Sequence, residues 1–413
     1  MSIASKRGVL AISMTFAAGG AAGAGGVAAA ESPAAAADEP ISVMSISTFE
    51  SPNYSTPAVE TAMRARAASL NAAGGINGHP LEITFCNDRL DPNEAGACAR
   101  RAVEDEVVAV IGGSTPNAAT ILPVLADAGI AWFGSSGTSG DIEIQDPIAY
   151  PLQAGVAGML IAAGRVLVDE GGATNVTVIA EDIATAVQGG ERQVLGVEAA
   201  GATATLVTVP AGAPDYSASA ATALDNDPDG VAIAGVPADI PKIILALRQA
   251  GYDGPIATVS SGLPPASIEA LGDDADNVYL TYRLVPTTNT DNPCIAQYID
   301  ELHGENPDEV VEENGLNSWT SLLVFEELAA GIDGPISAES FRTAADAVDA
   351  PIVTGCGPDY AGVPDTPDVA DYPRVSQFVA IASRIEGGVV HQIGDFFNPL
   401  AATESTATTG APG

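Results

Sequence analysis

The chain has 413 residues, with 15 Lys and Arg against 53 Asp and Glu, which gives a formal net charge of −38. This length suits two domains better than one continuous core. The negative charge excludes a nucleic-acid-binding role, because a phosphate backbone would be repelled. The acidic residues occur in short, scattered clusters, which indicates a solvated surface. We hypothesise that this surface suits a saline habitat, where salt screens the carboxylates.

The first 30 residues are predicted to be an export signal peptide. Lys6 and Arg7 supply a basic start, Gly8 to Val27 form a weakly apolar stretch, and Ala28-Ala29-Ala30 offers a small-residue cleavage site. An uncleaved signal anchor is the alternative, but its many glycines would make a poor membrane span. Removal of the two basic residues with the signal would take the net charge to −40.

Both ends of the mature chain are predicted to be disordered. Residues 31–40 form an Ala-rich, acidic spacer, and residues 401–413 form a polar tail. The first cysteine is Cys86, so no lipid-anchor cysteine lies near the cleavage site. We therefore expect an exported protein, periplasmic or extracellular and associated with the cell envelope, without a lipid anchor.

From Ile41 onward, apolar runs of strand length alternate with segments of helical spacing. The predicted strands are 41–47, 81–85, 107–111, 130–133, 176–180, 203–209, 230–234, 256–259 and 278–284. The predicted helices are 58–71, one opening at Asp91-Pro92, and 116–128, 156–170, 184–200, 215–224, 238–251, 264–271, 294–302, 319–330 and 338–347. Residues 375–384 and 389–393, joined by Gly387-Gly388, are predicted to form a final hairpin.

This order predicts an α/β fold of two doubly wound, Rossmann-like lobes joined by a three-strand hinge. Lobe 1 would comprise 41–150 and 285–350, and lobe 2 would comprise 151–284 and 375–395. The irregular segment 351–374 would be a hinge crossing. A ligand site is expected in the crevice outside the carboxyl ends of the strands.

The run from Leu70 to Ile130 carries a family resemblance. It contains the Gly-rich turn Asn71–Pro80, the acidic turn Asn87-Asp88 and the loop Val110–Thr115, in that order. It resembles the first lobe of type I periplasmic substrate-binding proteins, in the branched-chain amino-acid-binding (leucine/isoleucine/valine-binding) family of ABC transporters. The resemblance extends over about Ile41 to Ile393. It implies the type I periplasmic-binding-protein fold, a small-molecule ligand, a membrane permease as partner and a monomeric state.

Two polar loops follow adjacent predicted strands and are candidates for ligand binding. Ser114 and Thr115 lie in the first loop, and Ser136 and Thr138 lie in the second. Hydroxyls and free helix N–H groups there can hold an anion or a carbonyl. In the resembled family these loops grasp the α-carboxylate of the ligand. Plain helix capping is the alternative.

The second lobe departs from the amino-acid-binding members at three positions. The family places aromatic side chains where this chain has Thr185 and Val236, and an acidic partner for the ligand's ammonium where it has Ser261. A buried ammonium without a carboxylate partner is unfavourable by several kcal/mol. We therefore predict that standard branched-chain amino acids bind poorly.

Two aromatic residues are further candidates for the ligand site. Trp319 falls where relatives place a cleft-facing aromatic at the start of a helix, with core packing as the alternative. Tyr54 and Glu50 lie in the first loop, and Arg283 lies at the second lobe crossing. Arg283 could bind an anionic ligand or form a structural ion pair.

The four cysteines suit disulfides in an oxidising compartment. Cys86 ends a predicted strand, and Cys98 lies on the helix that packs back on it. Cys294 and Cys356 both fall in the C-terminal third. We predict the pairs Cys86–Cys98 and Cys294–Cys356, with free buried thiols as the alternative.

The sequence offers no catalytic residues, cofactor or metal site. None of its three histidines neighbours a credible nucleophile, and Gly134-Ser135-Ser136-Gly137 lacks the spacing of a nucleophile elbow. It lacks a phosphate-binding GxxxxGK[ST] loop and any Cys/His cluster for zinc. The sequence thus predicts a non-enzymatic solute-binding protein for an ABC transporter. The alternative is a ligand-sensing or scaffolding module of the same fold.

Overall fold

The computed structural model describes residues 39–51, 54–364 and 367–401. The predicted signal peptide, most of the predicted spacer and nearly all of the predicted tail lie outside the described residues. Among the residues that are described, no helix combines the length and the apolar character needed to cross a membrane.

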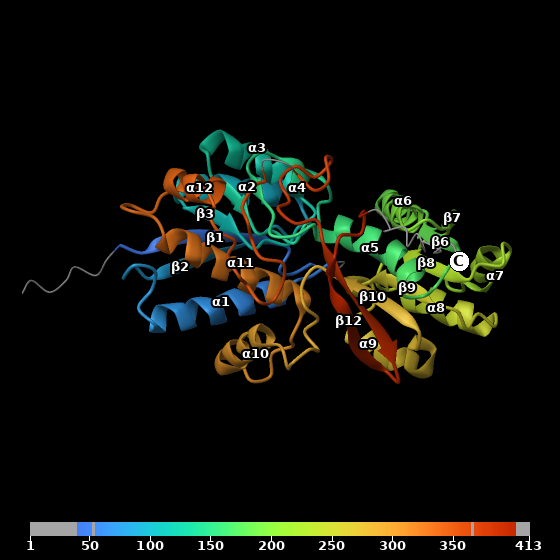
Figure 1. Ribbon diagram of the computed structural model, residues 1–413. Helices are drawn as coiled ribbons and strands as arrows, with labels where there is room; N and C mark the ends of the chain where they lie inside the picture. Colours follow the sequence, from blue (N-terminus) through green and yellow to red (C-terminus); the bar gives the residue numbers. More distant parts are fainter. Residues whose placement is uncertain (1–38, 52–53, 365–366, 402–413) are drawn as a thin grey trace, which may run out of the picture. The chain divides into compact units, whose positions relative to one another are not determined.

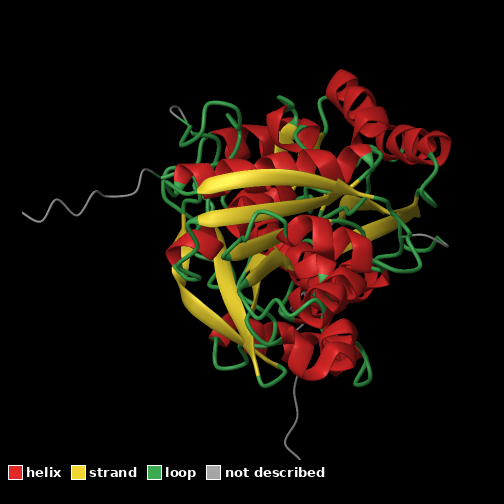
Figure 2. Ribbon diagram, turned by 90° about the vertical axis from the view of Figure 1, so that its right-hand side faces the viewer, coloured by secondary structure: helices red, strands yellow, loops and turns green. Residues whose placement is uncertain are grey.

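The first sheet has five parallel strands in the order β2-β1-β3-β4-β5. Their bounds are β1 Ile41–Ser47, β2 Leu81–Asn87, β3 Ala109–Ile111, β4 Ala131–Phe133 and β5 Ala149–Tyr150. Figure 2 shows the strands of both sheets in yellow among the red helices. Because both faces of a parallel sheet are covered, its inner strands β3 and β4 are apolar throughout, as in Ala131-Trp132-Phe133.

Helices pack on both faces of this sheet, and together they form lobe 1. Alternate residues of β1 point to opposite faces. Val43 joins a core with Val59 and Phe325, whereas Met44 joins a core with Ala99 and Ile121. Figure 1 shows α1 and α11 side by side, although they come from opposite ends of the chain. The helices are α1 Pro57–Ala72, α2 Pro92–Glu104, α3 Ala118–Ala128, α4 Ile142–Gln145, α10 Pro293–Glu305, α11 Glu313–Ala330 and α12 Ala338–Asp346.

The second sheet has seven strands in the order β12-β11-β10-β9-β8-β6-β7 and forms lobe 2 with its helices. The five strands β6 to β10 are parallel, and β11 and β12 form the predicted antiparallel hairpin at one edge. The strands are β6 Asn175–Glu181, β7 Thr203–Val209, β8 Gly230–Ala234, β9 Ile256–Val259, β10 Val278–Tyr282, β11 Ala380–Glu386 and β12 Val389–Phe397. The helices are α5 Gly155–Asp169, α6 Ala184–Ala199, α7 Ser217–Leu224, α8 Ile240–Gln249 and α9 Pro265–Leu271, with the 3-10 turns η1 Ser260–Gly262 and η2 Gly272–Ala275.

The chain passes between the two sheets after β5, after β10 and before β11. The predicted α/β class with two mainly parallel sheets is confirmed, whereas the exact domain boundaries stay predictions. Several elements differ from expectation, among them β11, which begins at Ala380 and not at residue 375. The short α4 and β5 were not predicted, and α11 begins at Glu313, six residues before the predicted start at Trp319.

Both predicted disulfides are present. Cys86 at the end of β2 is bonded to Cys98 on α2, with 5.7 Å between their Cα atoms. Cys294 on α10 is bonded to Cys356, with 5.3 Å between their Cα atoms. The alternative of free buried thiols is therefore wrong.

Candidate functional site

The two polar loops of lobe 1 lie side by side at the carboxyl ends of β3 and β4. Each begins with a glycine at a φ of +63°, Gly112 and Gly134, a conformation that side chains disfavour. A Cβ atom at Gly134 would also lie 2.3 Å from Ser321 Oγ on α11. The backbone N–H of Ser136 donates to the Gly113 carbonyl over 2.9 Å, which ties the loops together.

Ser114 and Tyr54 form a polar pair at the first loop. The Tyr54 Oη and Ser114 Oγ atoms lie 2.9 Å apart, and the Ser114 N–H donates to Ser47 Oγ over 2.9 Å. Burial raises the pKa of the Tyr54 phenol above its usual range, so the phenol is neutral at physiological pH. This pair therefore offers two neutral hydroxyls to a ligand.

The hydroxyls of Thr115 and Thr138 are used within the protein. The Thr115 hydroxyl donates to the buried carboxylate of Asp88, which also accepts from Thr48 Oγ1 at 2.6 Å and from Asn117 Nδ2 at 2.9 Å. The Thr138 hydroxyl donates to the Thr115 carbonyl over 3.0 Å. These hydrogen bonds stabilise the two loops. Because both threonine hydroxyls already donate within the protein, neither can donate to a ligand.

Ser136 differs from its neighbours because its buried Oγ has no hydrogen-bond partner among the described residues. Its carbonyl oxygen accepts a hydrogen bond from Arg283 Nη1 at 2.7 Å. A buried hydroxyl without a partner is unfavourable, which makes this atom a candidate contact for a bound molecule.

Glu143 lies behind the second loop and was missed by sequence reasoning. Its carboxyl group accepts hydrogen bonds from the Ser139 backbone N–H and, over 3.4 Å, from Trp132 Nε1. Complete burial raises its pKa above the usual range of a glutamate, since a charged carboxylate would be desolvated there. No motif marks this residue, since it lies on the one-turn helix α4.

The three predicted positions of lobe 2 line one pocket of about 190 Å³. Thr185, Val236 and Ser261 come from the start of α6, the loop after β8 and η1, at the carboxyl ends of the strands. The walls are otherwise mainly aliphatic, and they carry no charged side chain. The lining residues are Val156, Leu160, Ile183, Thr185, Ala186, Gly189, Ile233, Ala234, Gly235, Val236, Pro237, Ile240, Thr258, Val259, Ser261 and Gly262.

A buried ion pair connects the two lobes beside these walls. Arg283 follows β10 and is only 4% exposed, and its Nε lies 3.4 Å from Glu313 Oε1 at the first residue of α11. Arg283 Nη2 also donates to Asn314 Oδ1 over 2.7 Å. Glu313 accepts a hydrogen bond from the Ser260 hydroxyl of η1. Sequence reasoning considered Arg283 but missed Glu313, because the predicted helix began after it.

Trp319 lies in the core of lobe 1. Its side chain is fully buried, its indole Nε1 donates to Glu301 Oε2 over 2.7 Å, and its ring centre lies 5.9 Å from that of Tyr298. The Arg66 guanidinium covers the ring at 5.3 Å from the centroid. This environment matches the core-packing alternative and not a cleft-facing side chain, because the Trp319 ring is enclosed by Arg66 of α1 and Tyr298 of α10.

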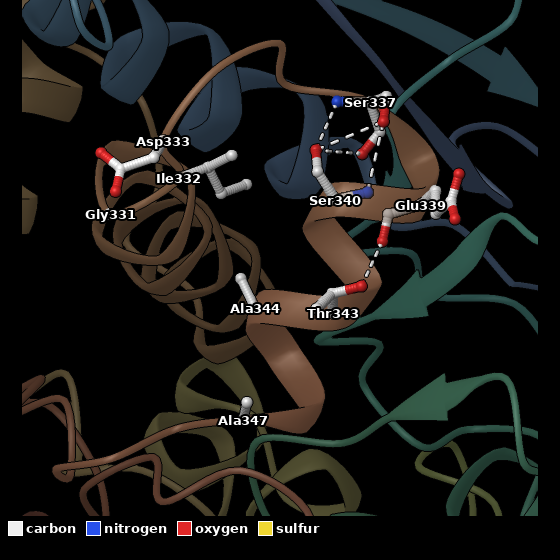
Figure 3. A pocket seen from close by; sticks show the side chains of 9 residues that line it. All are labelled: Gly331, Ile332, Asp333, Ser337, Glu339, Ser340, Thr343, Ala344 and Ala347. Atoms are coloured by element: carbon white, nitrogen blue, oxygen red, sulfur yellow. Dashed lines mark hydrogen bonds between the residues drawn. The ribbon is translucent and has the colours of Figure 1, made fainter.

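Another hollow, of about 500 Å³, lies beside α12 (Figure 3). Its walls come from residues 331–333, which follow α11, and from α12, at whose start Ser337 and Ser340 form a capping box. No predicted site residue lines it, and it does not lie at the carboxyl ends of the strands. Among the residues that the structure describes, no group of His, Cys, Asp and Glu is arranged to hold a metal ion.

Two mainly parallel sheets, each with covering helices and joined by three crossings, define an α/β protein of the periplasmic-binding class. The family model described as "Periplasmic binding protein" matches residues 40–365, and the chain belongs to this family. None of the curated proteins matches the chain in sequence.

Solved structures share this fold at low sequence identity. A possible leucine/isoleucine/valine-binding protein from Rhodopirellula baltica has a TM-score of 0.71 at 17% identity, covering 87% of this chain and 98% of its own. The branched-chain amino acid transporter substrate-binding protein LivJ from Streptococcus pneumoniae, in complex with isoleucine, has a TM-score of 0.67 at 18% identity, with coverages of 86% and 99%. A fatty acid ABC transporter substrate-binding protein from Thermomonospora curvata has a TM-score of 0.67 at 12% identity, with coverages of 87% and 93%.

Proposed function

We propose that this chain is an exported, monomeric solute-binding protein that captures a small molecule between its lobes and delivers it to an ABC transporter permease. One observation carries the proposal: the Ser114 and Ser136 loops of lobe 1 and the Thr185–Val236–Ser261 pocket of lobe 2 all lie at carboxyl ends of strands, and Arg283 links the lobes beside them. The proposal assigns no catalytic residue, cofactor or metal.

The mechanism is hinge closure around the ligand. A molecule that contacts both lobes stabilises the closed state only by binding it more tightly than the open state. Native mass spectrometry of the purified protein would identify a carried molecule, and small-angle scattering would follow its removal and return. We expect a smaller radius of gyration with the molecule bound. An unchanged radius with every bound ligand would contradict capture by closure.

We further propose that standard branched-chain amino acids are poor ligands. The lobe 2 pocket has no carboxylate for an ammonium group, and the charge of Glu313 is already paired with Arg283. Calorimetry with leucine should therefore show millimolar or undetectable binding, because an unpaired buried charge is unfavourable by several kcal/mol. Sub-micromolar leucine binding would overturn this proposal.

A ligand-sensing or scaffolding module of the same fold is the second candidate. Affinity purification with the ligand-loaded protein as bait, from membranes of its own organism, distinguishes the transport role from the sensing or scaffolding role. Recovery of an ABC permease supports transport, whereas recovery of a signalling or structural membrane protein in its place supports the alternative.

A further inference from the structure

The charged groups of the cleft already neutralise one another. Arg283 pairs with Glu313, donates to the Ser136 carbonyl and to Asn314, and is almost fully buried. Glu313 also accepts from the Ser260 hydroxyl. Arg283 Nε and Glu313 Oε1 lie 3.4 Å apart without a hydrogen bond between them. A ligand carboxylate could therefore reach Arg283 only against the like charge of Glu313, and a ligand ammonium could reach Glu313 only against the like charge of Arg283, unless the pair separated. Separating a buried pair leaves one charge uncompensated, which is strongly unfavourable.

The remaining polar groups at the lobe 1 loops also suit a neutral ligand. Ser114 Oγ, Tyr54 Oη and the unpartnered Ser136 Oγ are uncharged hydroxyls. The Asp88 carboxylate lies directly behind Thr115, and the whole chain carries a net charge of −38. Both the local charge and the net charge therefore repel an anionic ligand. Hydroxyls without a nearby free charge bind amide, carbonyl and hydroxyl groups.

The lobe 2 pocket suits a compact aliphatic group. Its volume of about 190 Å³ is the volume that about six water molecules occupy in liquid water. Val156, Leu160 and Ile240 supply much of its wall, and no charged side chain lines it. A short branched chain would lose its contact with water there, which is favourable in proportion to its apolar area.

We infer that the ligand is a small uncharged amphiphile, with a compact aliphatic group in the lobe 2 pocket and a neutral hydrogen-bonding head, such as a primary amide, at the Ser114 and Ser136 hydroxyls. This inference rests on the proposed function, because it takes the cleft as the capture site. Arg283 and Glu313 act in it as specificity-determining residues, since each removes the charge that the other could offer.

A ligand series with one isobutyl group and four head groups tests the inference. Calorimetry on the mature protein would compare isovaleramide, isovalerate, isopentylamine and leucine. We expect the amide to bind at least about tenfold more tightly than the other three, because only the amide leaves the Arg283–Glu313 pair intact. Equal or tighter binding of a charged member, or no detectable binding of any, would overturn the inference.

Two variants should change the ranking of these ligands in opposite directions. Glu313→Gln leaves Arg283 unpaired, so isovalerate should gain at least about tenfold relative to the amide. Arg283→Gln leaves Glu313 unpaired, so isopentylamine should gain instead. A purely structural role would weaken all four ligands alike and contradict the inference. Arg192→Gln is the matched control, since it removes the 2.6 Å Arg192–Asp141 pair between α6 and lobe 1 and should leave the ranking unchanged.

The failure of this inference can be separated from the failure of the proposed function. A charged molecule carried by the purified protein, with compaction on binding, would refute the neutral ligand and leave capture by closure standing. Absence of compaction with every bound molecule would refute the capture mechanism itself.

Discussion

At the scale of single residues, the sequence predicts which loops are polar but not which way each hydroxyl points. Ser114 and Thr115 are neighbours of similar chemistry, yet the Ser114 hydroxyl meets Tyr54 and the Thr115 hydroxyl meets the buried Asp88. Asp88 is 27 positions away in the chain, so no local pattern reveals this pairing. Glu143 is hidden for a different reason. Its partners Ser139 and Trp132 are only 4 and 11 positions away, but the one-turn helix α4 that carries it is too short to show a period.

Replacement of Gly134 should destabilise lobe 1. Gly134→Ala would place a side chain at a φ of +63° and a Cβ 2.3 Å from Ser321 Oγ, whose hydroxyl donates to the Gly134 carbonyl. We expect a loss of more than about 1 kcal/mol in the free energy of unfolding, measured with urea. Gly140→Ala is the matched control, because its φ is +75° but nothing lies within 4 Å of the added Cβ. Equal losses in the two variants would show that the contact with α11 is unimportant.

The buried Glu143 should make stability depend on pH. Burial raises its pKa in the folded state, so the folded protein binds a proton that the unfolded chain releases near pH 4.5. The stabilisation is complete below that pH and is lost as the pH rises through the raised pKa, by up to about 1.4 kcal/mol per pH unit. Urea unfolding from pH 5 to pH 8 should therefore show a steeper decline for the native chain than for Glu143→Gln.

The exposed Glu82 provides the comparison for this measurement. Glu82→Gln should leave the decline with pH as steep as in the native chain, because an exposed carboxylate is solvated in both states. If Glu143→Gln and the native chain gave parallel curves, the buried carboxyl would not be the source of the pH dependence.

At the scale of secondary-structure elements, the sequence predicts strands with a strong apolar pattern. It does not predict elements that are very short or that depend on tertiary contacts. The strands 41–47, 203–209, 230–234 and 256–259 agree with prediction to the residue, because each is an apolar run bounded by turn residues. The four-residue α4 and the two-residue β5 are too short to show a period.

The first turns of α11 show how tertiary contacts override local propensity. Gly315, Asn317 and Ser318 are weak helix formers, which is why the predicted helix began only at Trp319. In the structure, Asn317 Nδ2 donates to the Gly134 carbonyl over 3.0 Å, and Ser318 Oγ donates to the Gly112 carbonyl over 2.6 Å. These contacts with the binding loops extend the helix to Glu313. The sequence therefore failed to predict both the helix start and the cleft residue Glu313 for one reason, the tertiary contacts of the first turns.

The two disulfides should differ in their contribution to stability. Cys294–Cys356 spans 62 positions and Cys86–Cys98 spans 12, and the entropy lost by the unfolded chain grows with the length of the closed loop. Replacing both cysteines of a pair by alanine should lower the free energy of unfolding by about 4 kcal/mol for the long loop and about 3 kcal/mol for the short one. Urea unfolding of both variants checks the order, and a larger loss from the short loop would contradict the entropic explanation.

At the scale of the whole molecule, charge is the dominant property. The chain has 53 acidic residues and 15 Lys and Arg, so most carboxylates have no basic partner to pair with. In the described part of the chain, the ion pairs include several with one or both side chains well buried, such as Arg66–Glu301 and Arg283–Glu313. The surface carboxylates therefore repel one another in the compact state, and unfolding relieves part of this repulsion.

Salt should therefore stabilise this protein. The screening length falls from about 10 Å at 0.1 M to about 3 Å at 1 M ionic strength, so repulsion between surface carboxylates weakens as potassium chloride is added. We expect the midpoint of thermal unfolding to rise by several degrees from low salt to 1 M, with the steepest rise at low concentrations, where the screening length changes most. A rise that stayed linear to 1 M would instead indicate salt exclusion from the surface. A constant midpoint would refute the hypothesis that the acidic surface is suited to high salt, because repulsion would then contribute nothing measurable to stability.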